Sequence, residues 1–131
     1  MDFSGTNAFA FSNLSLKTDK ELFELYKKEA EGGKVDAMYY VGQMYQLGEG
    51  QPGNNPNYQE AFKWYRKVAE GGGVDAMYFV GQMYQLGDGQ PRNKPNYEEA
   101  VKWVDKAIDA GSEPSISLKK SIQEHMDMID A

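Results

Sequence analysis

Apolar residues recur along this chain at the spacing of helical faces, and the apolar runs are separated by short segments rich in Gly, Pro and Asn. Met38, Val41 and Tyr45 fall three and four positions apart, and Trp64 and Val68 continue the same pattern further on. Such spacing brings apolar side chains to one face of an α-helix. The pattern predicts six helices, near residues 18–32, 35–47, 57–71, 74–86, 96–110 and 114–129.

The predicted helix ends carry their own local signals. The pairs expected to form capping boxes are Thr18 with Glu21, Asn57 with Glu60 and Asn96 with Glu99. Gly48 stands where a helix commonly ends in a left-handed residue. Gly42 lies inside a predicted helix, where glycine costs about 1 kcal/mol relative to alanine. We therefore expect another backbone to pass very close to Gly42.

The chain repeats itself. Residues 35–72 align without gaps on residues 74–111, and 26 of the 38 aligned positions are identical. Ile116 and Ile122 continue the apolar pattern beyond the second copy, among charged residues that are typical of a helix capping a stack. The predicted organisation is a half-repeat at 18–33, repeats at 35–72 and 74–111, and a capping helix at 112–131.

Residues 1–17 lack a helical period and are rich in Ser, Asn and Gly. This composition predicts a flexible or extended arm in front of a solenoid that spans residues 18–131. Phe3, Phe9 and Phe11 are unusual for a plain tail. They lead to the hypothesis that the arm docks on the solenoid of the same or a neighbouring molecule.

The repeated motifs resemble a known family. Met38-x-x-Val41-Gly42-x-x-Tyr45 is similar to the first-helix signature of tetratricopeptide repeats. The Gly48-Glu49-Gly50 turn followed by Ala61-x-x-Trp64-Tyr65 resembles the Sel-1-like repeat (SLR) subclass. The resemblance implies an all-α fold, a right-handed superhelical solenoid of antiparallel helix pairs, and a general role as an adaptor or regulator that binds proteins or peptides.

Three departures from that family are visible. The spacing of the copies is 39 residues where the family unit is nearer 36 (about three more in the turn). Val104 takes the place of Tyr65 in the second copy, and the chain contains no Cys, so the disulfides of some SLR proteins are impossible here.

Charge and composition argue against several functions for this protein, including nucleic-acid binding and membrane insertion. Twenty acidic against fourteen basic residues give a formal charge of −6, which disfavours contact with nucleic acid. No apolar run has the length of a bilayer span, and no signal peptide is recognisable, so we expect a cytoplasmic protein without a membrane partner. The sequence suggests no cofactor or metal site.

An enzymatic role is also disfavoured. Ser117-x-x-Lys120 matches a short motif of penicillin-recognising enzymes, but the companion motifs and the required sheet are missing. His125 is the only histidine and lies in the predicted capping helix, where a surface position is expected. Trp64 and Trp103 are expected in the core.

If the tetratricopeptide geometry carries over, the first helices form a concave surface that binds a partner. The candidate residues are Asp36, Tyr39, Gln43, Gln46, Asp75, Tyr78, Gln82 and Gln85. Tyr39 and Tyr78 either bind a partner or only pack against neighbouring repeats, and the residues leave both readings open. The leading hypothesis is a non-catalytic interaction module, monomeric or weakly self-associating; the alternative is a dedicated inhibitor or immunity-type protein that blocks one enzyme.

Overall fold

The computed structural model describes residues 17–131, and this part of the chain forms six α-helices and no β-strand. The helices are α2 (Asp19–Glu31), α3 (Val35–Leu47), α4 (Tyr58–Glu70), α5 (Val74–Leu86), α6 (Tyr97–Asp109) and α7 (Pro114–Asp130). All six predicted helices are present, and their ends agree with the predictions to within one residue.

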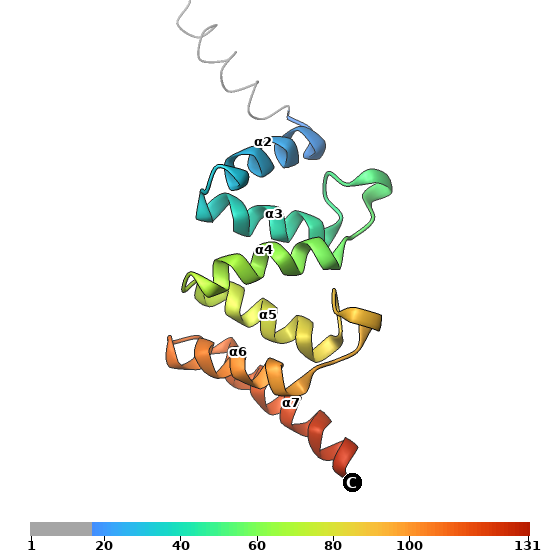
Figure 1. Cartoon of the computed structure of the whole chain (residues 1–131), viewed down its shortest axis with the longest axis vertical. Coiled ribbons are helices and arrows are strands. Elements are labelled where there is room, and N and C mark those ends of the chain that lie inside the picture. The colour runs from blue at the N-terminus through green and yellow to red at the C-terminus, as the bar shows by residue number, and fades with distance from the viewer. Residues whose placement is uncertain (1–16) are drawn as a thin grey trace, which may run out of the picture.

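Consecutive helices lie side by side in an antiparallel stack that runs from α2 at one end to α7 at the other (Figure 1). Two long loops, each with a short 3₁₀ turn, project on the same side of the stack. These turns are η1 (Pro52–Asn54) and η2 (Pro91–Asn93). The predicted fold class is confirmed: an all-α solenoid of antiparallel helix pairs.

The core runs along the stack, between the first helix of each repeat (α3 and α5) and the second (α4 and α6). Val41 of α3 and Val80 of α5 are fully buried, as are Ala61 and Tyr65 of α4. Trp64 is 8% exposed and Trp103 of α6 is 7% exposed, so both tryptophans are core residues as predicted. Apolar burial of this kind supplies most of the stability of such a stack.

Only one of the three expected capping boxes is complete. The Thr18 side chain accepts a hydrogen bond from the Glu21 backbone, and the Glu21 carboxylate accepts one from the Thr18 backbone, each at 3.1 Å. Asn57 and Asn96 cap α4 and α6, but the reciprocal carboxylate bond is absent there. The prediction was wrong for these two helices; Glu60, for example, pairs with Lys63 at 3.0 Å instead.

The prediction for Gly42 needs a correction as well. A Cβ at this position would lie 3.0 Å from Cδ1 of Tyr65, so the neighbour is a side chain of the paired helix and not its backbone. At the equivalent Gly81, a Cβ would lie 2.6 Å from Cγ2 of Val104. The glycines therefore make room for the residue that α4 or α6 directs at the first helix.

The last helix is longer than the others because its stop signal is missing. Gly48 and Gly87 end α3 and α5 in left-handed conformations, with φ of 80° and 81°. Met126 occupies the corresponding position in α7, and the helix continues through it to reach 17 residues. Ile122 is fully buried as the repeat alignment suggested, but Ile116 is 59% exposed, and the alignment is wrong about its place on the buried face.

Two further predictions concern the N-terminal arm and membrane-spanning helices. The arm of residues 1–17, with Phe3, Phe9 and Phe11, lies outside the described residues except for Lys17. Within residues 17–131, no helix combines the length and the apolar character needed to cross a membrane.

Candidate functional site

The eight predicted site residues lie on α3 and α5, in equivalent positions of the two repeats. Their exposure differs along the helices. Asp36 and Asp75, in the first turns, are exposed, whereas the two tyrosines and Gln43, Gln46 and Gln82 are half-buried. Gln85 is only 5% exposed. The open part of the predicted surface is therefore its N-terminal half.

A groove of about 350 Å³ lies in this half, and we name it the α3–α5 groove. It is formed by the first two turns of α3, Val68 in the last turn of α4, Gly73 before α5, and the first turn of α5. Its lining residues are Val35, Asp36, Tyr39, Tyr40, Val68, Gly73, Val74, Asp75 and Ala76. The structure thus brings three predicted residues, Asp36, Tyr39 and Asp75, into one cavity.

The two aspartates are held at the groove by helix geometry. Each is the second residue of its helix, where the partial positive charge of the helix N-terminus favours a carboxylate. Among residues 17–131, neither Asp36 nor Asp75 takes part in an ion pair. Both carboxylates are consequently free to meet a charged group from another molecule.

Tyr39 belongs partly to the core and partly to the groove. Its ring centroid lies 5.7 Å from that of Tyr65 and 6.3 Å from that of Phe79. Burial raises the pKa of the Tyr39 hydroxyl above its ordinary value, and the negative charge of Asp75 raises it further. The ring therefore packs on its neighbours, while its hydroxyl is subject to the negative charge of the Asp75 carboxylate at the groove.

Tyr40 is a groove residue that the sequence interpretation missed. This residue is 44% exposed, and its ring packs against Tyr26 of α2 at a centroid distance of 5.3 Å. The equivalent residue of the second repeat is Phe79, which stacks on the buried Tyr65 ring at 5.1 Å. The Tyr-to-Phe difference between two otherwise identical helix segments was the available signal.

The C-terminal half of the predicted surface is engaged inside the protein. Gln46 accepts a hydrogen bond from the Tyr65 hydroxyl at 2.7 Å. Gln85 donates from Nε2 to the Ser121 hydroxyl of α7 at 2.9 Å and lies 3.3 Å from Nδ1 of His125. The expectation of an open binding position is wrong for Gln85, because α7 covers it.

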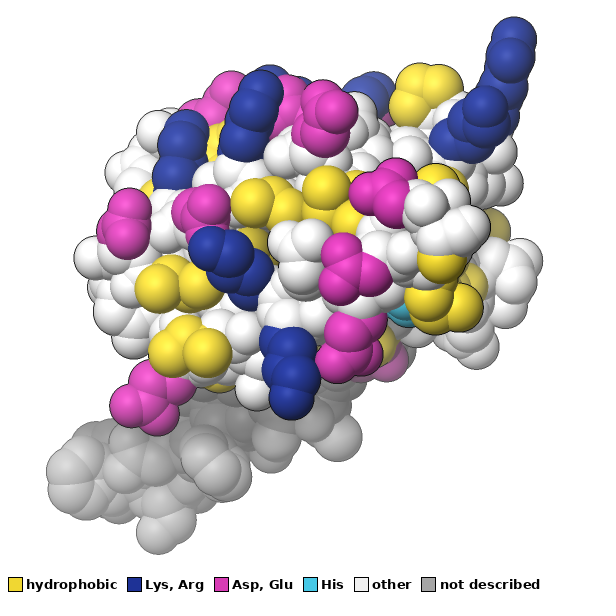
Figure 2. Space-filling model, turned by 90° about the horizontal axis from the view of Figure 1, so that it is seen from below, with side chains coloured by type: hydrophobic (Ala, Val, Ile, Leu, Met, Phe, Trp, Pro, Cys, Tyr) yellow, Lys and Arg dark blue, Asp and Glu magenta, His cyan; other side chains and the backbone are white. Residues whose placement is uncertain are grey.

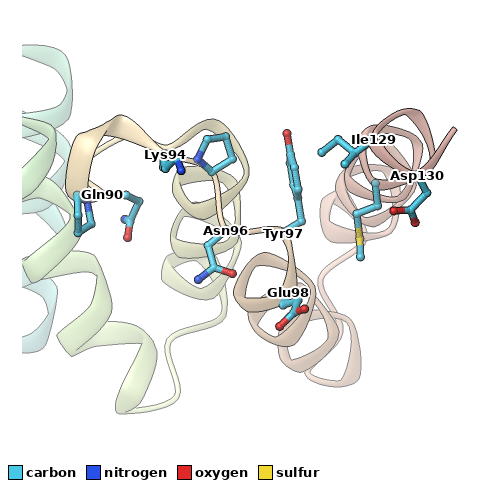
Figure 3. Close-up of a pocket in the computed structure, with 10 residues that line it drawn as sticks. Gln90, Lys94, Asn96, Tyr97, Glu98, Ile129 and Asp130 are labelled. Carbon is cyan, nitrogen blue, oxygen red and sulfur yellow. The ribbon is translucent and has the colours of Figure 1, made fainter.

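Hollows at the loops form a second candidate region. One of about 460 Å³ lies between the η2 loop and the end of α7, with the Tyr97 ring standing between Lys94 and Ile129 (Figure 3). A hollow of about 400 Å³ beside Tyr58 is its counterpart in the first repeat, and Gly89 and Asn93 of the next loop form part of its wall. The hollow beside Tyr97 has no following repeat whose loop could form this wall, and the end of α7 forms it instead. The difference between the two hollows therefore arises because the repeats end here.

The second helices also frame a hollow. It measures about 680 Å³ and lies between α4 and α6. Three cations and three carboxylates line it: Arg66, Lys102 and Lys106 with Glu70, Glu99 and Asp105. Several of these charges pair with each other or with neighbours; Arg66, for example, lies 3.4 Å from Glu70. This balance of charge gives the hollow no preference for a partner of either sign.

The α7 end of the stack carries mixed chemistry. Acidic and basic side chains are interspersed with apolar ones across this face (Figure 2). The large exposed apolar residues of α7 are Ile116, Met128 and Ile129. Lys119 binds Asp105 of α6 at 2.8 Å, which ties the helix to the stack.

The residues considered for catalysis are not assembled into a site. Ser117 and Lys120 are exposed on α7, and the described chain has no strand to support them. His125 is half-buried and contacts Gln85, so its expected surface position is only partly correct. Within residues 17–131, no three His, Cys, Asp or Glu side chains are grouped as metal ligands would be.

Comparison with known proteins identifies the repeats. The Sel1 repeat family model matches residues 35–73 and 74–112, which together are more than half of the chain. The protein is thus a helical-repeat protein, and it belongs to the Sel1 repeat family. A comparison with curated proteins found no match.

Three solved structures illustrate the likeness. A Sel1 repeat protein from Oxalobacter formigenes is 31% identical, with a TM-score of 0.69 over 79% of this chain and 40% of its own. Helicobacter pylori cysteine rich protein B is 23% identical, with a TM-score of 0.67 over 79% and 74%, which shows the fold alone. The protective antigen c5321 of uropathogenic Escherichia coli, with an SLR fold, is 25% identical, with a TM-score of 0.72 over 91% and 25%.

The match to the Oxalobacter protein thus spans less than half of that protein's length. Sel1-repeat proteins are generally protein-interaction modules, and the family is typically non-catalytic.

Proposed function

We propose that this protein is a non-catalytic interaction module that binds a segment of a partner protein along α3 and α5. The observation that carries the proposal is the α3–α5 groove, where Asp36, Tyr39 and Asp75 meet beside the exposed ring of Tyr40. The general role of the Sel1 repeat family supports it.

The groove has the chemistry of a peptide-binding surface. Tyrosines combine a rigid apolar ring with a hydroxyl that can bond a peptide, and such rings often anchor interfaces. Val35, which is 57% exposed, adds apolar contact area at the rim. The equivalent Asp75, Tyr78 and Gln82 continue the surface along α5, so a partner segment meets similar residues twice.

The test starts from affinity capture of a partner by the full-length protein, followed by titration calorimetry with the purified partner. We expect Tyr39→Ala combined with Tyr78→Ala to weaken binding by a few kcal/mol, the range for anchoring aromatics. Leu47→Ala combined with Leu86→Ala is the matched control, because these equivalent residues are exposed on the same two helices and line none of the four hollows.

Since Tyr39 packs on the core, thermal melts must accompany the binding data. Tyr40→Ala removes an exposed groove ring while leaving Tyr39 in place, and it serves where the double variant is unfolded. Normal binding by a folded Tyr40→Ala protein and by a folded double variant would contradict the proposal and move the site to another face.

The same capture separates an adaptor from an inhibitor. A single tight partner whose enzymatic activity falls on addition of this protein would identify an inhibitor or immunity-type protein. Several partners that share one bound segment would identify an adaptor.

A further inference from the structure

The α3–α5 groove differs in charge from the other hollows of the protein. Its lining contains two carboxylates, Asp36 and Asp75, and no Lys, Arg or His. The hollow between α4 and α6 and the hollow beside Tyr97 hold charges of both signs, and the hollow beside Tyr58 is lined by uncharged residues. Among the four hollows, only this groove is lined by acidic side chains without a basic one.

Among residues 17–131, no Lys, Arg or His forms an ion pair with Asp36 or Asp75. Lys34 immediately precedes α3, but its ammonium lies 3.4 Å from the carboxylate of Glu29. The formal charge of the whole chain is −6, so the surrounding field also favours a cation over an anion.

The walls of the groove suit the rest of a long basic side chain. Tyr39 and Tyr40 present aromatic rings, and a cation over the face of such a ring is attracted by its quadrupole. Val35 and Val74 provide apolar contact for methylene groups, which Lys and Arg bury while their charged ends stay polar. A guanidinium fits best, because it can stack on a ring and bond carboxylates through its planar fork.

We infer that the partner segment is basic, and that it places an arginine side chain in the α3–α5 groove, between Asp36 and Asp75 and against the rings of Tyr39 and Tyr40. The inference rests on the proposed function, and it adds the chemistry of the partner to it. The raised pKa of Tyr39, to which Asp75 contributes, agrees with the placement of that carboxylate beside the ring.

The experiment uses the full-length protein and a phage-displayed library of random linear peptides as the probe. We expect the selected peptides to be enriched in Arg and, less strongly, in Lys. Replacement of the selected Arg by citrulline, a neutral side chain of nearly the same shape, should weaken binding about tenfold or more. Affinity should also fall as salt is added, since exposed charges are screened.

Protein variants supply the second arm. Asp36→Asn combined with Asp75→Asn should weaken binding of the selected peptide about tenfold or more, with the shape of the groove retained. Glu24→Gln combined with Glu124→Gln changes the net charge equally on exposed residues of α2 and α7, and it should bind as the unchanged protein does. Circular dichroism and thermal melts establish that each variant is folded.

The outcomes separate the inference from the proposed function. Peptides that depend on Tyr40 but are not enriched in basic residues, and that bind the folded aspartate double variant normally, would overturn the inference and leave the interaction module standing. If no selected peptide depends on Tyr39, Tyr40 or Tyr78, both ideas are wrong. Equal losses in the aspartate and the glutamate variants would overturn the arginine placement, because net charge alone would then explain binding.

Discussion

The hydroxyl of Tyr65 donates a hydrogen bond to Oε1 of Gln46 across 2.7 Å, and this bond joins the two helices of the first repeat. The Tyr65 ring is fully buried, so its hydroxyl needs a partner within the protein. In the second repeat, Val104 replaces Tyr65 and offers no donor. Gln85, the equivalent of Gln46, instead bonds Ser121 of α7. One repeated glutamine thus serves two different contacts.

Removal of the Tyr65 hydroxyl should destabilise the protein moderately. We expect Tyr65→Phe to lower the free energy of unfolding by about 1 kcal/mol, the usual net value of one hydrogen bond. Denaturant unfolding measures the change, and Tyr58→Phe, which alters an exposed tyrosine, should have almost no effect. Equal stabilities of the two variants would show that the Gln46 contact contributes nothing.

The hydroxyl of Tyr39 should report on Asp75. Burial raises the pKa of Tyr39, and the carboxylate of Asp75 raises it further because ionisation of Tyr39 would place a second negative charge nearby. We expect Asp75→Asn to lower the pKa of Tyr39 while burial still keeps it above the ordinary value. The ¹³Cζ shift of Tyr39, followed by NMR against pH, measures this, and Asp36→Asn should change it less. An unchanged titration in Asp75→Asn would contradict the groove geometry.

A larger residue at Gly42 should destabilise the fold itself. Even the Cβ of a substituted residue would lie 3.0 Å from the Tyr65 ring, so Gly42→Leu should cost roughly 1–3 kcal/mol or more. Gly42→Ala should cost less, because the ring must move only slightly and alanine gains about 1 kcal/mol in helix propensity. Thermal melts of the two variants compare them, and a stable Gly42→Leu protein would refute the close packing.

The two η turns contain a natural comparison of residues in the left-handed region. Gly53 has φ of 64°, and Arg92 occupies the same place in the second repeat with φ of 59°. A residue with a side chain is strained in this conformation, and glycine would relieve the strain. Glycine also gives the unfolded chain more conformational freedom, which offsets part of this gain. We therefore expect Arg92→Gly to stabilise the protein by up to about 1 kcal/mol. Gly53→Arg should do the reverse. Chemical unfolding tests both, and loss of stability in Arg92→Gly would show that the arginine side chain contributes favourable contacts.

Helices, turns and the class of fold could be predicted because their causes are local. The apolar period marks α3 and α5 to the residue, Asn57 and Asn96 accept cap bonds where expected, and the 39-residue repeat implies neighbours that stack. A side chain three or four positions away, or a glycine at a helix end, acts within a single turn. These interactions involve residues that are close together in the sequence, and they can therefore be predicted from it.

What only the tertiary structure decided is which equivalent residues remain open. Gln46 and Gln85 occupy identical local sequences, yet one receives the Tyr65 hydroxyl and the other is buried under α7. Tyr40 and its equivalent Phe79 each pack on a tyrosine of the preceding helix, yet Tyr40 is 44% exposed and Phe79 is half-buried. Exposure depends on the helix that packs next to a residue, and that helix is distant in sequence. The repeated sequence therefore determined the stack of helices. Which part of the α3 and α5 surface stays open, including the groove at Asp36 and Asp75, depends on how neighbouring helices such as α7 cover the rest.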